Sequence, residues 1–125
     1  MNRSDPHFLA GRLVLIVEDE FYLATDLAAA LTDIGALVLG PANSLAAAGR
    51  LLDESRPDCA VLDINLRGDS TGPLAARLAA QGTPFLVLSG YDRAAVPASI
   101  ADAPFLEKPV DTAEVIRQLA ALTRP

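Results

Sequence analysis

Short, uninterrupted apolar runs constrain the fold of this chain most strongly. Leu13–Val17, Cys59–Leu62 and Phe85–Leu88 are apolar at every position, and Pro104–Leu106 is a shorter segment of the same kind. Strands that are apolar on both faces are typical of parallel sheets that helices cover on each side. These segments therefore predict buried parallel strands, and a chain of 125 residues is long enough for one such domain.

Between and after these runs, apolar residues return at intervals of three and four, which is the spacing of an amphipathic helix. The stretches are Ala24, Leu27, Ala28, Leu31 and Ile34; Leu45, Ala48 and Leu52; Leu74, Ala75, Leu78 and Ala79; and Val115, Leu119 and Leu122. Alternating strands and helices predict an α/β fold, a doubly wound five-stranded parallel sheet flanked by five helices with right-handed crossovers. Pro97 would disrupt a long fourth helix, so we expect that helix to be short or irregular.

Polar residues follow the predicted strands directly. Glu18 and Asp19 come after the first strand and Asp63 after the third. Ser89 and Lys108 follow the last two strands. Ligands of such sheets bind beyond the carboxyl ends of the strands, so we expect these five side chains to converge at one edge.

The chemistry of this edge depends on Lys108, which is the only lysine, whereas the other nine basic residues are arginines. An ammonium is a compact charge that a planar guanidinium cannot replace in a tight anionic pocket. Crowded carboxylates need a cation or a raised pKa, and oxygen ligands without histidine or cysteine suit Mg²⁺. With a hydroxyl and an ammonium, the edge could hold a phosphoryl group on a carboxylate. Taken alone, however, Glu18, Asp19 and Glu20 could equally be helix N-cap residues.

Four motifs together resemble the receiver domain of two-component response regulators. They are Val17-Glu18-Asp19-Glu20, Val61-Leu62-Asp63-Ile64-Asn65-Leu66, Leu88-Ser89-Gly90 and Glu107-Lys108-Pro109. The resemblance spans about Arg12 to Leu122 and implies a flavodoxin-like, CheY-like sheet of strand order 2-1-3-4-5. We expect a receiver domain over residues 12–125, preceded by a flexible N-terminal arm over residues 1–11.

The resemblance also implies a role for the acidic residues. Asp63 would accept a phosphoryl group from a phosphohistidine and become an acyl phosphate. Asp19 would bind Mg²⁺ directly, and Glu18 would act mainly through a metal-bound water. An oxygen of Asp63 and the backbone carbonyl of Asn65 would complete the protein ligands.

The remaining pocket residues would respond to the phosphoryl group. Lys108 would pair with its oxygens, and in this family the Lys-Pro peptide is commonly cis. Ser89 would move toward the phosphoryl group, and Phe105 would swing inward when the hydroxyl moves. The signal would then appear on the surface of the fourth helix, fifth strand and fifth helix. The plainer alternatives are a Ser89-Gly90 turn and a core position for Phe105.

These implications describe a stand-alone response regulator of a two-component phosphorelay that switches a protein-binding surface. Its chemistry would be limited to its own phosphorylation and autodephosphorylation. Its partners would be a sensor histidine kinase, a protein effector and, in some receivers, a second copy as a homodimer. The turn at residues 89–91 is similar to that of receivers often associated with HWE-type kinases. The alternatives are a phosphorylation-independent adaptor receiver, a phosphate sink, or a haloacid dehalogenase-type phosphatase. Such a phosphatase would need a second acid at the position of Asn65.

Composition narrows the partners further. The formal net charge is −6 and the arginines are scattered, which argues against direct nucleic-acid binding. Residues 1–12 contain no apolar stretch long enough for a signal peptide or membrane span, so we expect a cytoplasmic protein without a membrane partner. The single cysteine, Cys59, lies in an apolar run that predicts core packing, and His7 is expected to be a tail residue.

Overall fold

A computed structural model describes residues 5–90, Ile100 and residues 102–123. Its centre is a five-stranded parallel sheet of order β2-β1-β3-β6-β7. The strands are β1 (Leu13–Val17), β2 (Leu37–Ala42), β3 (Cys59–Asp63), β6 (Phe85–Ser89) and β7 (Phe105–Glu107). Because β6 and β7 are the fourth and fifth strands of this sheet along the chain, the predicted order 2-1-3-4-5 is confirmed.

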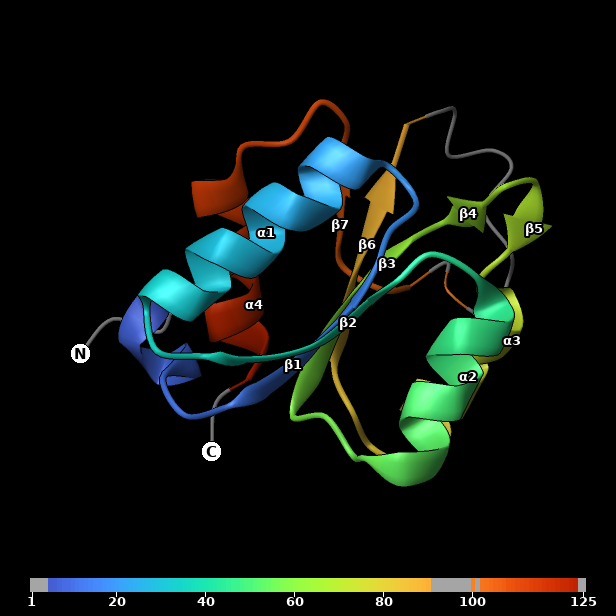
Figure 1. The fold of residues 1–125 in the computed structure, drawn as a ribbon, viewed down its shortest axis with the longest axis horizontal. Coiled ribbons are helices and arrows are strands. Elements are labelled where there is room, and N and C mark those ends of the chain that lie inside the picture. The colour runs from blue at the N-terminus through green and yellow to red at the C-terminus, as the bar shows by residue number, and fades with distance from the viewer. Residues whose placement is uncertain (1–4, 91–99, 101, 124–125) are drawn as a thin grey trace.

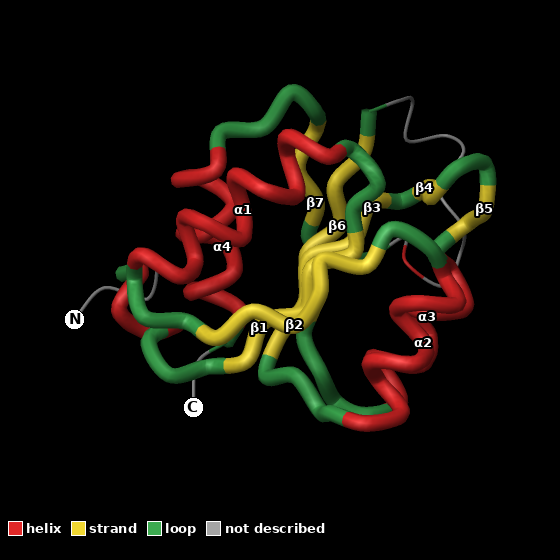
Figure 2. Tube along the Cα trace, viewed as in Figure 1, coloured by secondary structure: helices red, strands yellow, loops and turns green. Residues whose placement is uncertain are grey.

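Helices cover both faces of the sheet, which confirms the doubly wound fold (Figures 1 and 2). Helices α1 (Phe21–Asp33) and α4 (Thr112–Leu122) lie on one face, and α2 (Leu45–Glu54) and α3 (Gly72–Ala80) lie on the other. The described part of the chain thus has four α-helices where the sequence predicts five. The predicted helix around Pro97 falls at residues 91–99, outside the described residues.

Alternate residues of the central strands enter two separate cores. In β1, Val14 and Ile16 pack with α1 and α4, whereas Leu15 and Val17 pack with α2 and α3. All four side chains are fully buried. A strand whose two faces are both buried has no solvent side, which explains why the run is apolar at every position. Cys59 is also fully buried in the first core, as predicted.

Within the predicted flexible arm, residues 5–11 are folded onto the domain. Pro6–Leu9 form a short 3₁₀ helix, and the carboxylate of Asp5 accepts a hydrogen bond from the backbone N–H of His7 at 2.9 Å. Leu9 is fully buried in the core beside α1 and α4. Burying a leucine side chain contributes about 2 kcal/mol, which holds this part of the segment in place. His7 itself stays exposed beside Asp5.

A two-stranded hairpin follows β3 and is not predicted from the sequence. Strands β4 (Asn65–Leu66) and β5 (Asp69–Ser70) are antiparallel, and Arg67 and Gly68 form the turn with φ of 51° and 88°. Two-residue turns in which both φ angles are positive are type I′ turns, which usually carry asparagine, aspartate or glycine at the first position. Arginine at that position gives no turn signal, so the sequence predicts only an open loop here.

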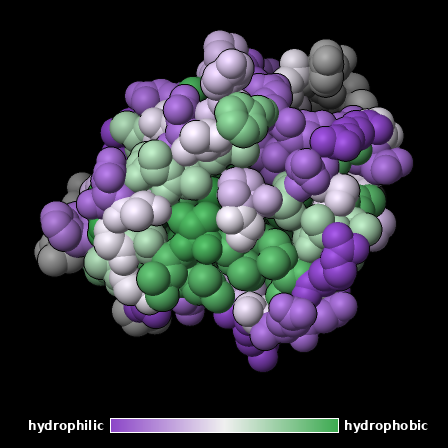
Figure 3. Space-filling model, viewed as in Figure 1, coloured by the Kyte–Doolittle hydropathy of each residue, from purple (hydrophilic) through white to green (hydrophobic). Residues whose placement is uncertain are grey.

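The surface carries an apolar area away from the carboxyl ends of the strands. Figure 3 shows it at the centre of one face, over the region where β1 and β2 lie in Figure 1. Strand β2 is the edge strand, and its Leu37 is 58% exposed. Among the helices of the described residues, none has the length and apolar character needed to cross a bilayer.

Candidate functional site

The carboxyl ends of the strands bring the predicted polar residues to one edge of the sheet. Glu18 and Asp19 follow β1, and Asp63 is the last residue of β3. Ser89 is the last residue of β6, and Lys108 follows β7. Three of these residues, Asp19, Asp63 and Lys108, line an open cleft of about 760 Å³. The strand-end rule therefore locates the cleft from sequence alone.

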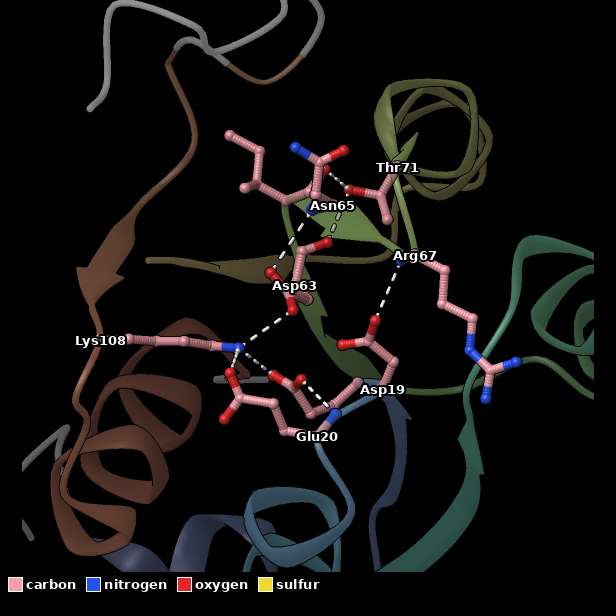
Figure 4. A network of polar contacts seen from close by, with 9 residues as sticks. Asp19, Glu20, Asp63, Asn65, Arg67, Thr71 and Lys108 are labelled. Atoms are coloured by element: carbon pink, nitrogen blue, oxygen red, sulfur yellow. Dashed lines mark hydrogen bonds and ion pairs between the residues drawn. The ribbon is translucent and has the colours of Figure 1, made fainter. Parts of the chain in front are cut away.

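The ammonium of Lys108 lies among three carboxylates (Figure 4). Its Nζ is 2.9 Å from Glu18 Oε1, 3.0 Å from Asp63 Oδ2 and 3.0 Å from Glu20 Oε1. Burial by itself would lower the pKa of Lys108, but the ion pairs with Glu18, Asp63 and Glu20 outweigh it and raise the pKa above its ordinary value. Lys108 is therefore a permanent cation, and its three N–H groups face three acids.

Glu18 is the most deeply buried acid of the cluster, with 1% of its surface exposed. Its Oε2 accepts a hydrogen bond from the backbone N–H of Glu20 at 2.9 Å. Its Oε1 is close enough to Lys108 for an ion pair but is not aligned for a hydrogen bond, and no described group donates one to it. Burial raises the pKa of Glu18 well above its usual range, against the opposing effects of the Glu20 N–H and of Lys108. A buried carboxylate oxygen without a donor is suited to ligating a cation.

Glu18, Asp19 and Asp63 together form a cluster of oxygen donors. One carboxylate oxygen from each lies within 4.8 Å of the others. Asp19 Oδ2 accepts a hydrogen bond from the backbone N–H of Arg67 at 3.0 Å, and Asp63 Oδ1 accepts a long one from the Asn65 N–H at 3.4 Å. The Arg67 side chain points away from Asp63 (Figure 4). Like charges this close repel unless a cation or a proton intervenes, and the oxygen-only donor set fits a hard divalent cation.

The acidic run does not serve as a helix cap. Glu20 occupies the N-cap position of α1, but its side chain makes no capping hydrogen bond. Instead its carboxylate reaches Lys108. Glu18 and Asp19 precede the cap and face the cleft region together with Asp63. The N-cap alternative therefore does not account for these three acids.

Ser89 and Phe105 lie on the neighbouring parallel strands β6 and β7. Ser89 is 2% exposed at the end of β6, and its backbone carbonyl accepts a hydrogen bond from the Lys108 N–H at 2.7 Å. Phe105 begins β7 and is half-buried against the core beside α2 and α3, as the packing alternative expects. The Lys108–Pro109 peptide bond is cis, as the family resemblance implies.

Sequence reasoning missed Thr71, which supports the end of β3. Thr71 is fully buried, and its hydroxyl lies 2.8 Å from the carbonyl oxygen of Asp63 and 3.0 Å from that of Ile64. A threonine before Gly72 and Pro73 resembles an ordinary helix N-cap, and Thr71 does occupy the N-cap of α3. Its side chain makes no capping bond, however, and instead fixes the main chain that carries Asp63.

Comparisons with known proteins agree with this fold and cleft. The family model of the response regulator receiver domain matches residues 14–120. The solution structure of SdrG from Sphingomonas melonis Fr1 is similar, with a TM-score of 0.76, 32% identity and coverage of 98% of each chain. A response regulator from Burkholderia pseudomallei, solved with a phosphorylated aspartic acid, a calcium ion and citrate, matches with a TM-score of 0.75 and 26% identity. That match covers 86% of this chain and 66% of that one.

A third structure is similar in fold alone. The response regulator PhyR from Brucella abortus has a TM-score of 0.79 at 20% identity, over 96% of this chain and 51% of that one. This chain therefore spans about half the length of PhyR. No match was found among curated protein sequences. Because the receiver-domain model covers most of the sequence and the sheet order and acidic cleft agree with it, this chain belongs to the response regulator receiver domain family.

Proposed function

We propose that this chain is a stand-alone response regulator that accepts a phosphoryl group on Asp63 in a Mg²⁺-dependent reaction. One observation carries the proposal: the Asp63 carboxylate lies 3.0 Å from the Lys108 ammonium and belongs to the same oxygen cluster as Glu18 and Asp19. Phosphoryl transfer needs a nucleophile with positive charge on either side of the transferred group, because the charge of the transition state spreads over its oxygens. Lys108 supplies one such charge, and a cation in the cluster would supply the other.

The residues that would hold Mg²⁺ are Asp19, Asp63 and the backbone carbonyl of Asn65, with Glu18 acting mainly through a water. Mg²⁺ prefers carboxylate and carbonyl oxygens and keeps several waters, so this partly open donor set suits it. The carboxylate oxygens of Glu18, Asp19 and Asp63, one from each within 4.8 Å of the others, support the fit. When bound, the ion would neutralise the phosphoryl oxygens during transfer.

The transfer itself would be an in-line displacement. An oxygen of the Asp63 carboxylate forms a bond to phosphorus while the bond between phosphorus and the donor breaks, and the leaving group keeps the electron pair. Lys108 would remain beside the phosphoryl oxygens. We propose that Ser89, buried at the neighbouring strand end, moves toward the group and that Phe105 follows it inward. The reaction makes the protein its own substrate and gives no turnover of external phosphomonoesters.

Exposed aromatic residues that follow Glu20 in the chain favour a protein as the phosphoryl donor. Phe21 and Tyr22 at the start of α1 are 72% and 81% exposed, and their rings lie edge to face with centroids 5.4 Å apart. Exposed aromatic pairs are typical of protein interfaces. We therefore propose a sensor histidine kinase as the donor, in the cytoplasm. The subgroup similarity to partners of HWE-type kinases involves Tyr91, which lies outside the described residues.

The complete pocket favours phosphorylation over an adaptor role, because an adaptor has no use for a lysine held against an acceptor carboxylate. A phosphate sink would use the same chemistry without an effector. A haloacid dehalogenase-type phosphatase needs a second acid two residues after the nucleophile. Here that position is Asn65, which argues against this function. Effector binding and homodimer formation would be the outputs of the phosphorylated state.

The test is phosphorylation of the intact chain by acetyl phosphate with Mg²⁺, followed by intact mass. We expect one phosphoryl adduct in the wild type, its loss when Mg²⁺ is chelated, and its absence in Asp63→Asn. The matched control is Asp69→Asn, an exposed acid in β5 that should label normally. A wild-type protein that is folded by circular dichroism but does not label, or an Asp63→Asn variant that does, would contradict the proposal.

A further inference from the structure

Glu20 differs from the other two carboxylates that contact Lys108. Its side chain is 60% exposed, whereas those of Glu18 and Asp63 are 1% and 9% exposed. All three lie at nearly the same distance from Nζ, between 2.9 and 3.0 Å. Glu20 is thus the one acid among these three that can exchange Lys108 for water at low cost.

Carboxylate oxygens crowd the lysine ammonium: Asp63 and Glu20 accept its hydrogen bonds, and Glu18 Oε1 forms an ion pair with it at 2.9 Å. A lysine ammonium carries three donors, and three carboxylates face it here. A phosphoryl oxygen that reaches Nζ must therefore displace one of them. Asp63 is the acceptor itself, and Glu18 would be left charged and buried without its partner, so Glu20 is the acid whose release costs least.

The backbone of Glu20 is fixed, so this release needs only a side-chain movement. Its N–H donates to Glu18 Oε2 at 2.9 Å, and its carbonyl accepts the Ala24 N–H at 2.9 Å in the first turn of α1. The Glu20 carboxylate makes no capping hydrogen bond to α1 that would hold it in place. It instead accepts a hydrogen bond from Lys108 Nζ at 3.0 Å, and the two side chains meet in Figure 4.

We propose that Glu20 is a displaceable counterion of Lys108 that positions the lysine in the unphosphorylated pocket and gives way when the phosphoryl group arrives. The inference rests on the proposed phosphorylation of Asp63. Glu20 is a positioning residue here: it lowers the affinity of the pocket for a phosphoryl-like anion by competing for the same ammonium. Removing its charge should strengthen anion binding.

The test measures the affinity of the full chain for beryllium trifluoride, a phosphoryl mimic, at a Mg²⁺ concentration that saturates each variant. An exposed ion pair is worth up to about 1 kcal/mol, so Glu20→Gln should bind the mimic about two- to fivefold more tightly. Glu20→Asp keeps the charge but shortens the side chain, and it should also bind more tightly. Glu107→Gln removes an equal charge from an exposed neighbour of Lys108 and should match the wild type.

Three results would overturn the inference. They are an unchanged or weaker affinity in Glu20→Gln, a wild-type affinity in Glu20→Asp, and an equal gain in Glu107→Gln, which would reflect net charge alone. Labelling by acetyl phosphate separates this inference from the proposed function. Wild-type labelling of Asp63 without a gain in Glu20→Gln refutes only the counterion role. Tighter binding of the mimic in Glu20→Gln without labelling of Asp63 refutes only the phosphorylation.

Discussion

Glu18 should make the metal-free protein less stable as the pH rises, which is unusual for an acidic side chain. Burial raises the pKa of Glu18 from 4.5 to about 7 in the folded state. The folded protein therefore binds more protons than the unfolded chain between these values, and the free energy of unfolding falls as the pH rises through this window. Above pH 7 both states are ionised and the loss is complete, at about 1 to 3 kcal/mol.

The assay is urea unfolding followed by circular dichroism, without divalent metal, at several values between about pH 5.5 and pH 8. Glu18→Gln is the comparison, because it keeps the size of the side chain and removes the proton equilibrium. Asp5 and Glu114 have lowered pKa values, through bonds from His7 and from Gln118 and Arg117 respectively. They add stability with rising pH, but only below this window. Equal pH slopes in the wild type and Glu18→Gln would refute the reasoning.

Three further predictions test other parts of the structure. Thr71→Val keeps the side-chain shape but removes the hydroxyl that binds the carbonyl at the end of β3, so urea unfolding should show a loss of about 1 to 3 kcal/mol; unchanged stability would contradict that role. Replacing Phe21 and Tyr22 with alanine should slow transfer from the partner kinase but leave acetyl phosphate labelling unchanged, and equal loss of both would refute a docking role. Gly40→Ala should lower the melting temperature, because φ is +96° and the new Cβ would lie 2.7 Å from a backbone nitrogen. Gly49→Ala, where nothing lies within 4 Å, should raise it, and a change of the same sign in both would contradict the steric argument.

The sheet and the cleft could be predicted because burial on both faces leaves a direct mark on sequence. Val14 and Leu15 are both apolar because they enter different cores, and the apolar runs of β1 and β3 stop at the acids Glu18 and Asp63. Asp63 and Lys108 are 45 residues apart, yet the parallel topology alone predicts that they meet.

What could not be predicted depends on contacts without a local pattern. The type I′ turn has arginine, Arg67, at its first position instead of the usual asparagine, aspartate or glycine. The hydrogen bond from the Arg67 N–H to Asp19 joins residues 48 positions apart. Phe8, Leu9 and Ala10 form an apolar stretch too short to show a helix or strand period, so the burial of Leu9 depends on its tertiary contacts. Thr71 and Glu20 both stand at helix N-caps, and only their tertiary partners show that neither side chain is used for capping.

The most direct test of the proposed function is to map the phosphorylated residue. The protein is labelled with acetyl phosphate and Mg²⁺, the acyl phosphate is reduced with borohydride, and the peptides are analysed by mass spectrometry. Reduction converts a phosphorylated aspartate to homoserine, and we predict homoserine at position 63 alone. Reduction products at Glu18 or Asp19, or an unmodified Asp63 in a protein that carries a phosphoryl adduct, would contradict the assignment of Asp63 as the acceptor.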